Sequence, residues 1–249
     1  MLPAGSQKSL FALALLVSSS ALFAQEICNN AIDDDGDGLI DLNDIADCSC
    51  IDSLSLSPLP NGGFESQSCC PNGISLTNCI QGWSQVTTPT TDYFHACDFM
   101  PAFVPTPLPD GDGCVGMFSV DGWQEYIGTC LSAPLPATVQ ASVTFKYSGF
   151  DVDGSVTNAQ TWSFGTTQIA VYGFPTCPIL AIVTTNCPAG WSGGVLLGSV
   201  TVLPNGSWQQ AQINFTPAQN IEYLALGSPC GLPPSFQWTA GYGPYLLLD

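Results

Sequence analysis

The stretch ASVTFKY, residues 141–147, carries the pattern that decides the fold. Val143, Phe145 and Tyr147 alternate with polar residues, so an extended chain places the three apolar side chains on one face. The stretch QQAQINF, residues 209–215, repeats this alternation. Period-two patterning is typical of strands with one buried face, and no window of the chain shows a sustained helical period. These segments therefore predict an all-β protein.

Two further segments, IEYLALG at 221–227 and YLLLD at 245–249, have the continuous apolar composition of buried strands. The pair Asn205-Gly206 precedes the second alternating segment and predicts a hairpin turn. Pro, Gly, Ser and Thr separate the short apolar runs throughout residues 61–249. Many short strands divided by turn residues predict a β-sandwich for this region.

The charge balance of the chain is one-sided. Its 249 residues include 20 acidic and only two basic side chains, Lys8 and Lys146, which gives a formal net charge of −18 at pH 7. Nucleic acids and anionic lipids bind to cationic surfaces, so neither is an expected partner. The charged partners that this composition favours are cations.

Residues 1–24 have the pattern of a secretory signal peptide. Lys8 supplies the positive charge, residues 10–17 (LFALALLV) form a short apolar stretch, and cleavage is expected after Ala24. A buried N-terminal helix is the alternative. No later segment approaches the about 20 apolar residues that a membrane-spanning helix needs, so we expect a secreted mature chain without membrane insertion.

The chain contains twelve cysteines, an even number. After a secretory signal, this indicates disulfides formed in an oxidising compartment. Most pairings stay open, because the possible connectivities are too many to resolve from spacing. Zinc binding is the alternative, and it is disfavoured by the single histidine, His95, and by the lack of paired CxxC motifs.

Residues 25–50 form an acidic module, and residues 51–60 (IDSLSLSPLP) have the composition of a linker. The segment CNNAIDDDGDGLIDLNDIADC, residues 28–48, places oxygen ligands at the spacing of an EF-hand calcium loop, with Gly38 at the sharp turn. The expected ligands are Asp33, Asp35, Asp37, the Leu39 carbonyl, Asp41 and Asp44. Oxygen ligands without imidazole or thiolate favour Ca²⁺. A disordered acidic linker is the alternative.

The cysteines at the two ends of this loop have a physical reason. The carboxylates repel one another until an ion binds, so folding and calcium binding are coupled. A bridge between Cys28 and Cys48 would close the loop and reduce the entropy of the metal-free chain. Cys50 is the competing partner for Cys28.

The segment EICNNAIDDDGDGLIDLNDIADC, residues 26–48, resembles a short acidic repeat, typically C-x-N-x-x-D-D-D-x-D-G-x-x-D-…-C, of secreted and surface proteins of Bacteroidetes and other Gram-negative bacteria. The resemblance implies a calcium-stiffened spacer beside other modules. Asp44, where EF-hand loops have glutamate, is similar to dockerin-type loops. A cysteine that usually follows the position-9 aspartate is Leu42 here, which departs from the repeat.

LPNGGFES, residues 59–66, resembles the opening of galactose-binding-like jelly rolls, including many carbohydrate-binding modules, and residues 245–249 resemble their last strand. In that fold the first and last strands meet, which implies a structural calcium near Glu65 and Asp249. Residues 82–97 (GWSQVTTPTTDYFHAC) resemble a segment of secreted Bacteroidetes proteins that often carry a C-terminal sorting domain. That resemblance implies further domains in a longer chain.

Carbohydrate sites stack flat aromatic rings on the C–H surfaces of sugars and place acids and amides on the hydroxyls. Most tryptophans of a sandwich belong to its core, but Trp123 and Trp191 lie in expected turns or loops. Near Trp123, in SVDGWQEY, the side chains that could reach sugar hydroxyls are Asp121, Gln124 and Glu125. We therefore expect carbohydrate, or a cell-surface glycan, as the partner.

An enzymatic alternative has less support. No GxSxG or HExxH motif is present, and the only histidine, His95, lies close to Cys97, which we expect to be oxidised. Carboxylate pairs for glycoside hydrolysis exist, but acids occur throughout the chain and so do not select an activity. The sequence predicts a calcium-stabilised, non-catalytic protein for carbohydrate binding or cell-surface adhesion. The alternatives are an adhesive surface protein without a small ligand and a secreted glycoside hydrolase.

Substitution of Asp37 by alanine removes a central ligand of the expected calcium loop. We expect this variant to lose calcium binding at residues 33–44, where the wild-type dissociation constant should lie in the weak extracellular range, about 10⁻⁴–10⁻³ M. Titration calorimetry of the mature protein measures this binding. A wild-type protein that takes up no calcium contradicts the loop assignment.

Overall fold

The computed structural model describes residues 57–249 except positions 76, 178–186 and 190–192. The chain divides into two compact units, Met1–Leu56 and Ser57–Asp249, and all elements below belong to the second. The expected signal peptide, the acidic loop with its calcium ligands and the Cys28–Cys48 bridge lie outside the described residues. The same holds for the linker up to position 56.

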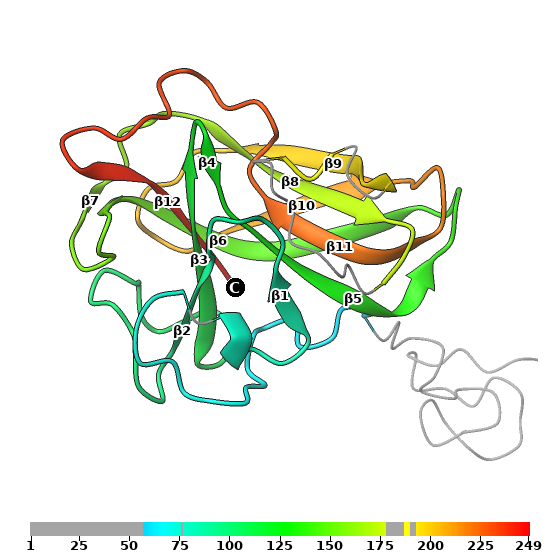
Figure 1. The fold of residues 1–249 in the computed structure, drawn as a ribbon, viewed down its shortest axis with the longest axis horizontal. Coiled ribbons are helices and arrows are strands. Elements are labelled where there is room, and N and C mark those ends of the chain that lie inside the picture. The colour runs from blue at the N-terminus through cyan, green and yellow to red at the C-terminus, as the bar shows by residue number, and fades with distance from the viewer. Residues whose placement is uncertain (1–56, 76, 178–186, 190–192) are drawn as a thin grey trace, which may run out of the picture. The chain divides into compact units, whose positions relative to one another are not determined.

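The second unit is built from short strands joined by long loops, and Figure 1 shows these strands in two layers. The strands are β1 (Trp83–Gln85), β2 (Asp92–His95), β3 (Gly113–Val120), β4 (Trp123–Gln124), β5 (Tyr126–Leu135), β6 (Ala141–Asp153), β7 (Ala159–Thr161), β8 (Thr167–Phe174), β9 (Val195–Val202), β10 (Gln209–Phe215), β11 (Ile221–Gly227) and β12 (Tyr242–Leu248). One 3-10 turn, η2 (Thr77–Cys79), precedes them. No helix in the described part of the chain is long and apolar enough to cross a membrane.

The strands form two antiparallel sheets that pack as a sandwich (Figure 1). One sheet has the order β1-β5-β11-β8-β9, and the other has the order β10-β6-β12-β3-β2, with β4 paired to β3 and β7 to β6. The two alternating segments, β6 and β10, pair from Gln209 opposite Tyr147 to Phe215 opposite Ala141. The predicted all-β sandwich is therefore confirmed.

The core between the sheets contains the apolar face of the two alternating strands. Val143, Phe145, Ile213 and Phe215 are buried there, while Gln212 on the opposite face of β10 is exposed. Burying a side chain of this size contributes about 1.5–3 kcal/mol relative to leaving it in water. The alternation in the sequence thus defines which face of each strand turns inward.

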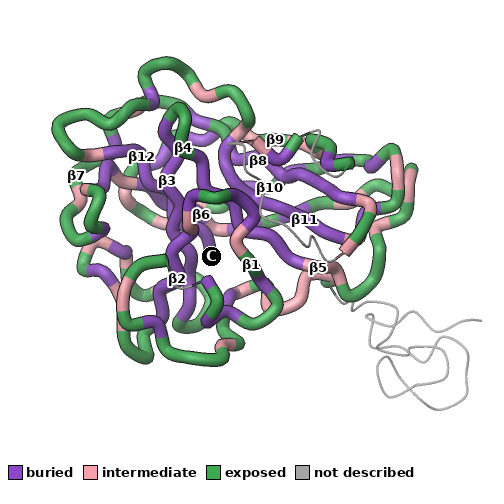
Figure 2. Tube along the Cα trace, in the orientation of Figure 1, coloured by how far each residue is buried: buried purple, intermediate pink, exposed green. Residues whose placement is uncertain are grey.

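Both sheets also bury apolar side chains on their outer faces, under loops. These outer clusters include Tyr172 and Tyr223 on the five-stranded sheet, and Phe94, Phe118 and Tyr245 on the seven-stranded sheet. Figure 2 shows β3, β8 and β12 buried along most of their length. Burial on two faces explains why β11 and β12 are continuous apolar runs in the sequence.

The Asn205-Gly206 pair lies in a tight turn, with Gly206 at φ +79°, but the turn does not close a hairpin. It joins β9 of the five-stranded sheet to β10 of the seven-stranded sheet. Each of these strands pairs with a different neighbour, β9 with β8 and β10 with β6. The hairpin prediction is wrong because turn residues specify a local chain reversal and not the partner of each strand.

The last strand, β12, is central in its sheet and does not pair with β1. β12 lies between β6 and β3, whereas β1, the first strand of the described region, lies at the edge of the other sheet. The segment of the jelly-roll resemblance, residues 59–66, forms no strand, but Leu59 and Phe64 line a pocket together with Leu248 and Asp249, so this opening segment lies beside the end of the last strand. Leu246 and Leu248 of β12 belong to the core between the sheets, and Tyr245 and Leu247 belong to an outer cluster. A strand that buries both faces is best placed in the middle of a sheet.

Disulfides tie the loops to this sandwich, as the cysteine count predicts. The pairs are Cys69–Cys79, Cys70–Cys97, Cys130–Cys177 and Cys187–Cys230. A disulfide typically stabilises by about 2–4 kcal/mol, which is useful in loops that bury little apolar surface. Cys114 on β3 is a buried free thiol, and it packs in an outer cluster as a small apolar side chain.

Candidate functional site

A small hollow opens where five separate segments of the chain meet, and we call it the tryptophan hollow. Trp123 and Trp238 lie at its rim, 49% and 44% exposed, and Asp92, Phe118 and Glu125 also line it. Its volume is about 150 Å³. Pockets for drug-sized ligands are larger, about 300–1,000 Å³, so this hollow suits a small group or a single ring.

Trp123 owes its position to the tight turn between β3 and β4. Val120 pairs with Trp123 across the turn, and Gly122 adopts φ +78°, which glycine tolerates best. The Trp123 indole N–H donates a hydrogen bond to Glu125 Oε1 at 3.1 Å. This bond holds the ring while part of it remains in contact with solvent.

Trp238 comes from the loop between β11 and β12. Its ring packs against Phe118 with the ring centroids 4.8 Å apart, and it lies over Gly243, where a Cβ atom would be 3.1 Å from the ring. The Asp121 N–H donates to the Phe236 carbonyl at 2.7 Å, and Gln237 Nε2 donates to Asp121 Oδ2 at 3.1 Å. These bonds tie the turn that carries Trp123 to the loop that carries Trp238.

Two buried acids face the hollow. Asp92, at the start of β2, is 3% exposed and accepts hydrogen bonds from the Ser75 N–H at 2.6 Å and from the Tyr245 hydroxyl at 2.5 Å. Glu125 is equally buried, and its Oε2 accepts from the Phe118 N–H at 2.8 Å. Hydrogen bonds from the protein thus hold both carboxyl groups in place.

Burial makes these two carboxyl groups hold their protons unusually tightly. Desolvation raises the pKa of Asp92 to about 6. Desolvation, with a contribution from the nearby charge of Asp92, also raises the pKa of Glu125 well above its ordinary value. No basic side chain lines the hollow, so neither acid has a cationic partner there.

The predicted carbohydrate residues are placed differently from one another. Trp123 and Glu125 line the hollow, and Asp121 lies in the adjoining turn. Gln124 is buried, and its amide donates to Ser228 Oγ at 2.8 Å and to a backbone carbonyl, so it does not face the hollow. Trp191 lies outside the described residues.

Sequence reasoning did not select Trp238, and it considered Asp92 only as one of many acids. Trp238 stands in a loop rich in small and polar residues, SFQWTAGYG, before a buried strand, and this is the same signal that marked Trp123. No sequence pattern around Asp92 marked it as a functional residue. It begins a short strand, and its burial depends on Tyr245, which is 153 residues away in the sequence.

Cys97, which lies close to His95 in the sequence, is not available as a nucleophile. The Cys97 N–H donates a hydrogen bond to His95 Nδ1 at 3.1 Å, and Cys97 is bonded to Cys70. The sulfur is therefore unable to act as a thiolate nucleophile. The expectation that Cys97 is oxidised is confirmed.

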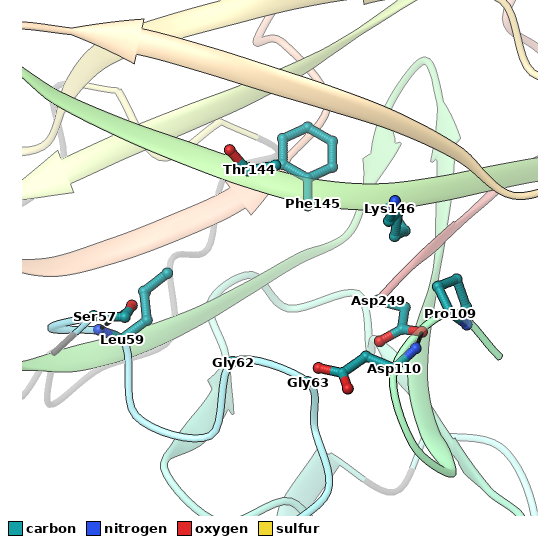
Figure 3. A pocket seen from close by; sticks show the side chains of 10 residues that line it. All are labelled: Ser57, Leu59, Gly62, Gly63, Pro109, Asp110, Thr144, Phe145, Lys146 and Asp249. Carbon is teal, nitrogen blue, oxygen red and sulfur yellow. Dashed lines mark hydrogen bonds between the residues drawn. The ribbon is translucent and has the colours of Figure 1, made fainter. Parts of the chain in front are cut away.

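A second cavity of about 460 Å³ lies beside the last strand, and we call it the Asp249 cavity (Figure 3). Figure 3 shows the side chains of Asp110 and Asp249 next to each other in its wall, with Lys146 on β6 across the cavity. Asp249 Oδ2 accepts from the Asp110 N–H at 3.1 Å. Its other oxygen, Oδ1, is buried and has no hydrogen-bond partner.

The two expected ligands of a structural calcium differ in how well they fit an ion. Asp249 is 8% exposed, and desolvation raises its pKa to about 6, although the positive charge of Lys146 acts in the opposite direction. Glu65 Oε1 instead accepts hydrogen bonds from the Asp112 and Gly113 N–H groups, both at 2.9 Å. Within the described residues, no three His, Cys, Asp or Glu side chains are grouped to hold a metal ion. Asp249 and Asp110 thus lie together in the wall of the cavity, whereas Glu65 holds the loop at Asp112 and Gly113.

Comparison with known proteins gives distant similarities. No family model and no curated protein matches the chain. The K1 cleaved adhesin domain of Lys-gingipain from Porphyromonas gingivalis W83 is 15% identical, with a TM-score of 0.38 over 68% of this chain and 88% of that chain. The K2 cleaved adhesin domain of Lys-gingipain is 14% identical, with a TM-score of 0.41 over 75% and 93%.

A third similar structure is TmCBM61 in complex with β-1,4-galactotriose. It is 15% identical, with a TM-score of 0.38 over 78% of this chain and 94% of that chain. A structure of CBM29-2, a carbohydrate-binding module, has 6% identity and a TM-score of 0.35 over 72% and 86%. None of these similarities reaches a level that identifies a family or a ligand.

The titration of Asp92 predicts how stability depends on pH. The folded protein binds this proton more tightly than the unfolded chain, because the pKa rises from 3.8 to about 6 on folding. The free energy of unfolding should therefore fall as the pH rises through this window. In the Asp92→Asn variant the free energy of unfolding should fall less over the same pH range, by up to about 3 kcal/mol less than in the wild type.

Urea unfolding at a series of pH values measures this effect. The Asp98→Asn variant removes an exposed acid outside the hollow and should keep the wild-type slope. Equal slopes for wild type and Asp92→Asn would show that Asp92 is not the titrating group.

Proposed function

We propose that this chain is a secreted, non-catalytic binding protein whose tryptophan hollow takes carbohydrate. The observation that carries the proposal is the pair Trp123 and Trp238, which come from different loops and stand half-exposed at the rim of one hollow. Large aromatic side chains are usually buried, and two held in place at one rim form a ready contact surface. Flat apolar rings of this kind suit the C–H faces of pyranoses.

The two buried acids of the hollow supply hydrogen-bond acceptors for sugar hydroxyls. Asp92 and Glu125 carry carboxyl oxygens, and each ionised carboxylate has about four lone-pair sites, of which protein donors use only some. The remaining sites suit sugar hydroxyls as hydrogen-bond donors. The small volume of the hollow favours one sugar ring, such as the end of a glycan, over a long polysaccharide segment.

Secretion and calcium form the second part of the proposal. The four disulfides of the described region suit an oxidising compartment, in agreement with the expected signal peptide. Calcium is proposed at the acidic loop, with the ligands predicted between Asp33 and Asp44, and at the Asp249 cavity. At the cavity the support is the unpartnered Asp249 Oδ1 together with the adjacent Asp110.

Adhesion without a small ligand is the competing function. The outer face of β10 supports it, because Gln210, Gln212 and Asn214 are exposed there on a regular sheet surface. A polar sheet face of this kind offers hydrogen bonds to another macromolecule. A glycan array separates the two functions, and a screen for hydrolysis of the bound glycans tests the remaining alternative, a glycoside hydrolase acting through Asp92 and Glu125.

Alanine substitutions at the rim test carbohydrate binding. We expect Trp123→Ala and Trp238→Ala each to weaken binding to an array-selected glycan by about tenfold or more, since each removes a stacking surface. The matched control is Leu203→Ala, which truncates an exposed apolar side chain that does not line the hollow. Wild-type protein that binds no glycan, or Trp variants that bind like wild type, would refute the proposed site.

Calcium at the Asp249 cavity is tested in the Asp37→Ala background, where the acidic loop should not contribute. Saturating calcium at about 100 times its dissociation constant should raise the free energy of unfolding by about 2.7 kcal/mol. The additional substitution Asp110→Asn should greatly reduce this gain, and the exposed control Asp98→Asn should leave it intact. Thermal or urea unfolding with and without chelator measures it, and an unchanged gain in Asp110→Asn contradicts the site.

A further inference from the structure

We propose that the tryptophan hollow prefers sugars that carry a protonated amino group, such as glucosamine residues, over neutral and anionic sugars. This inference rests on the proposed function and names its ligand class. Four features of the hollow support it: two buried carboxyl groups, the absence of a basic partner, three aromatic rings and a small volume.

The first step concerns the charge at the floor of the hollow. Asp92 and Glu125 are both 3% exposed, and both line the same small cavity. Buried carboxylates are normally paired with a cation, because desolvating an unpaired charge is costly. Here every hydrogen-bond donor that the two groups accept from is neutral, namely two backbone N–H groups, a tyrosine hydroxyl and an indole N–H. Burial therefore keeps these groups protonated more readily than exposed acids, and a bound cation would favour their ionised forms.

Among the described residues, no basic side chain lines the tryptophan hollow. Besides the single histidine, the basic side chains of the chain are Lys8 and Lys146. Lys8 belongs to the expected signal peptide, and Lys146 lines the Asp249 cavity and donates to Gln210 Oε1 at 2.7 Å. A cationic ligand group can supply a positive charge to this lining, and a net charge of −18 favours the approach of a cation over an anion.

The walls of the hollow suit an ammonium group as well. Trp123, Trp238 and Phe118 all line it, and a cation within about 6 Å of an aromatic centroid is attracted to the ring face, most strongly by tryptophan. An ammonium group has three N–H donors, which match the free lone pairs of the two carboxylates. The same tryptophan rings provide the stacking surface for the sugar ring that carries the group.

The competing ligand classes satisfy fewer of these groups. A neutral sugar can stack and donate hydroxyl hydrogen bonds, but it gains no charge–charge attraction from the two acids when they are ionised. An anionic sugar, such as a uronate, brings a like charge to the acids and meets no basic side chain in the lining. Amino sugars alone use the rings, the carboxylates and the charge together.

Three β-1,4-linked oligosaccharides of equal length test the proposal, because they differ at one substituent. Their units are glucosamine, N-acetylglucosamine and glucose, which present an ammonium, an acetamide and a hydroxyl group at the same ring carbon. Calorimetry of the full chain at neutral pH, where Asp92 with its pKa of about 6 is ionised, measures each affinity. We expect the glucosamine oligomer to bind about tenfold or more tightly than the other two. Its affinity alone should fall as the salt concentration rises.

The outcomes separate this inference from the proposed function. Neutral oligomers that bind as tightly as the glucosamine oligomer overturn the amino-sugar preference and leave carbohydrate binding intact. No binding by these oligomers, together with an empty glycan array, overturns the proposed function itself. Binding of the glucosamine oligomer that persists in the Trp123→Ala, Trp238→Ala double variant places it elsewhere on the acidic surface, and this also overturns the inference.

Substitution of the acids gives a second test. Asp92→Asn keeps the shape of the side chain and removes its charge, so the ratio of glucosamine to glucose affinity should fall towards one. The exposed control Asp98→Asn should keep the wild-type ratio. If Asp92→Asn does not fold, the salt dependence of the wild-type protein still decides, because a salt-independent preference would show that charge does not select the ligand.

Discussion

The hydrogen bond from the Tyr245 hydroxyl to the Asp92 carboxyl joins the centre of the sandwich to the candidate site. Tyr245 lies on β12, in the middle of the seven-stranded sheet, and its ring packs edge-on against Phe118 and Phe103. Gly116 on the neighbouring strand leaves room for this ring, because a Cβ atom there would overlap the Tyr245 hydroxyl. Moving Tyr245 would therefore disturb the packing of β12 and the floor of the hollow together.

The site is otherwise made of loops that the sandwich and its cross-links hold in place. Hydrogen bonds of Asp121 join the turn with Trp123 to the loop with Trp238. The Glu125 carboxyl group accepts a hydrogen bond from the Trp123 indole N–H. Such bonds limit the conformational entropy that aromatic side chains would lose on binding a ligand. The disulfide Cys70–Cys97 adds a covalent tie at the end of β2, the strand that begins with Asp92.

Part of the candidate site could be predicted from sequence. Trp123 and Glu125 lie within a few residues of each other beside Gly122, and a tryptophan next to a turn is a recognisable exception to core packing. Trp238 and Asp92 could not be placed with them, since Trp238 lies more than a hundred residues further along the chain, Asp92 lies in a separate strand, and all four meet only in the folded chain. Gln124 was predicted as a site residue but does not face the hollow. Side chains alternate along a strand, so the residue after Trp123 points inward and bonds to Ser228.

The sequence by itself determined the strand class, the inward faces of β6 and β10, and the use of disulfides, because period-two alternation and cysteine content act locally and need no knowledge of distant partners. Tertiary structure alone decided that β12 is central, that Asn205-Gly206 bridges two sheets, and that Cys114 stays unpaired. It also brought two tryptophans and two acids to one hollow. These outcomes depend on which surfaces remain to be buried once the sheets pack, and no local pattern encodes that competition.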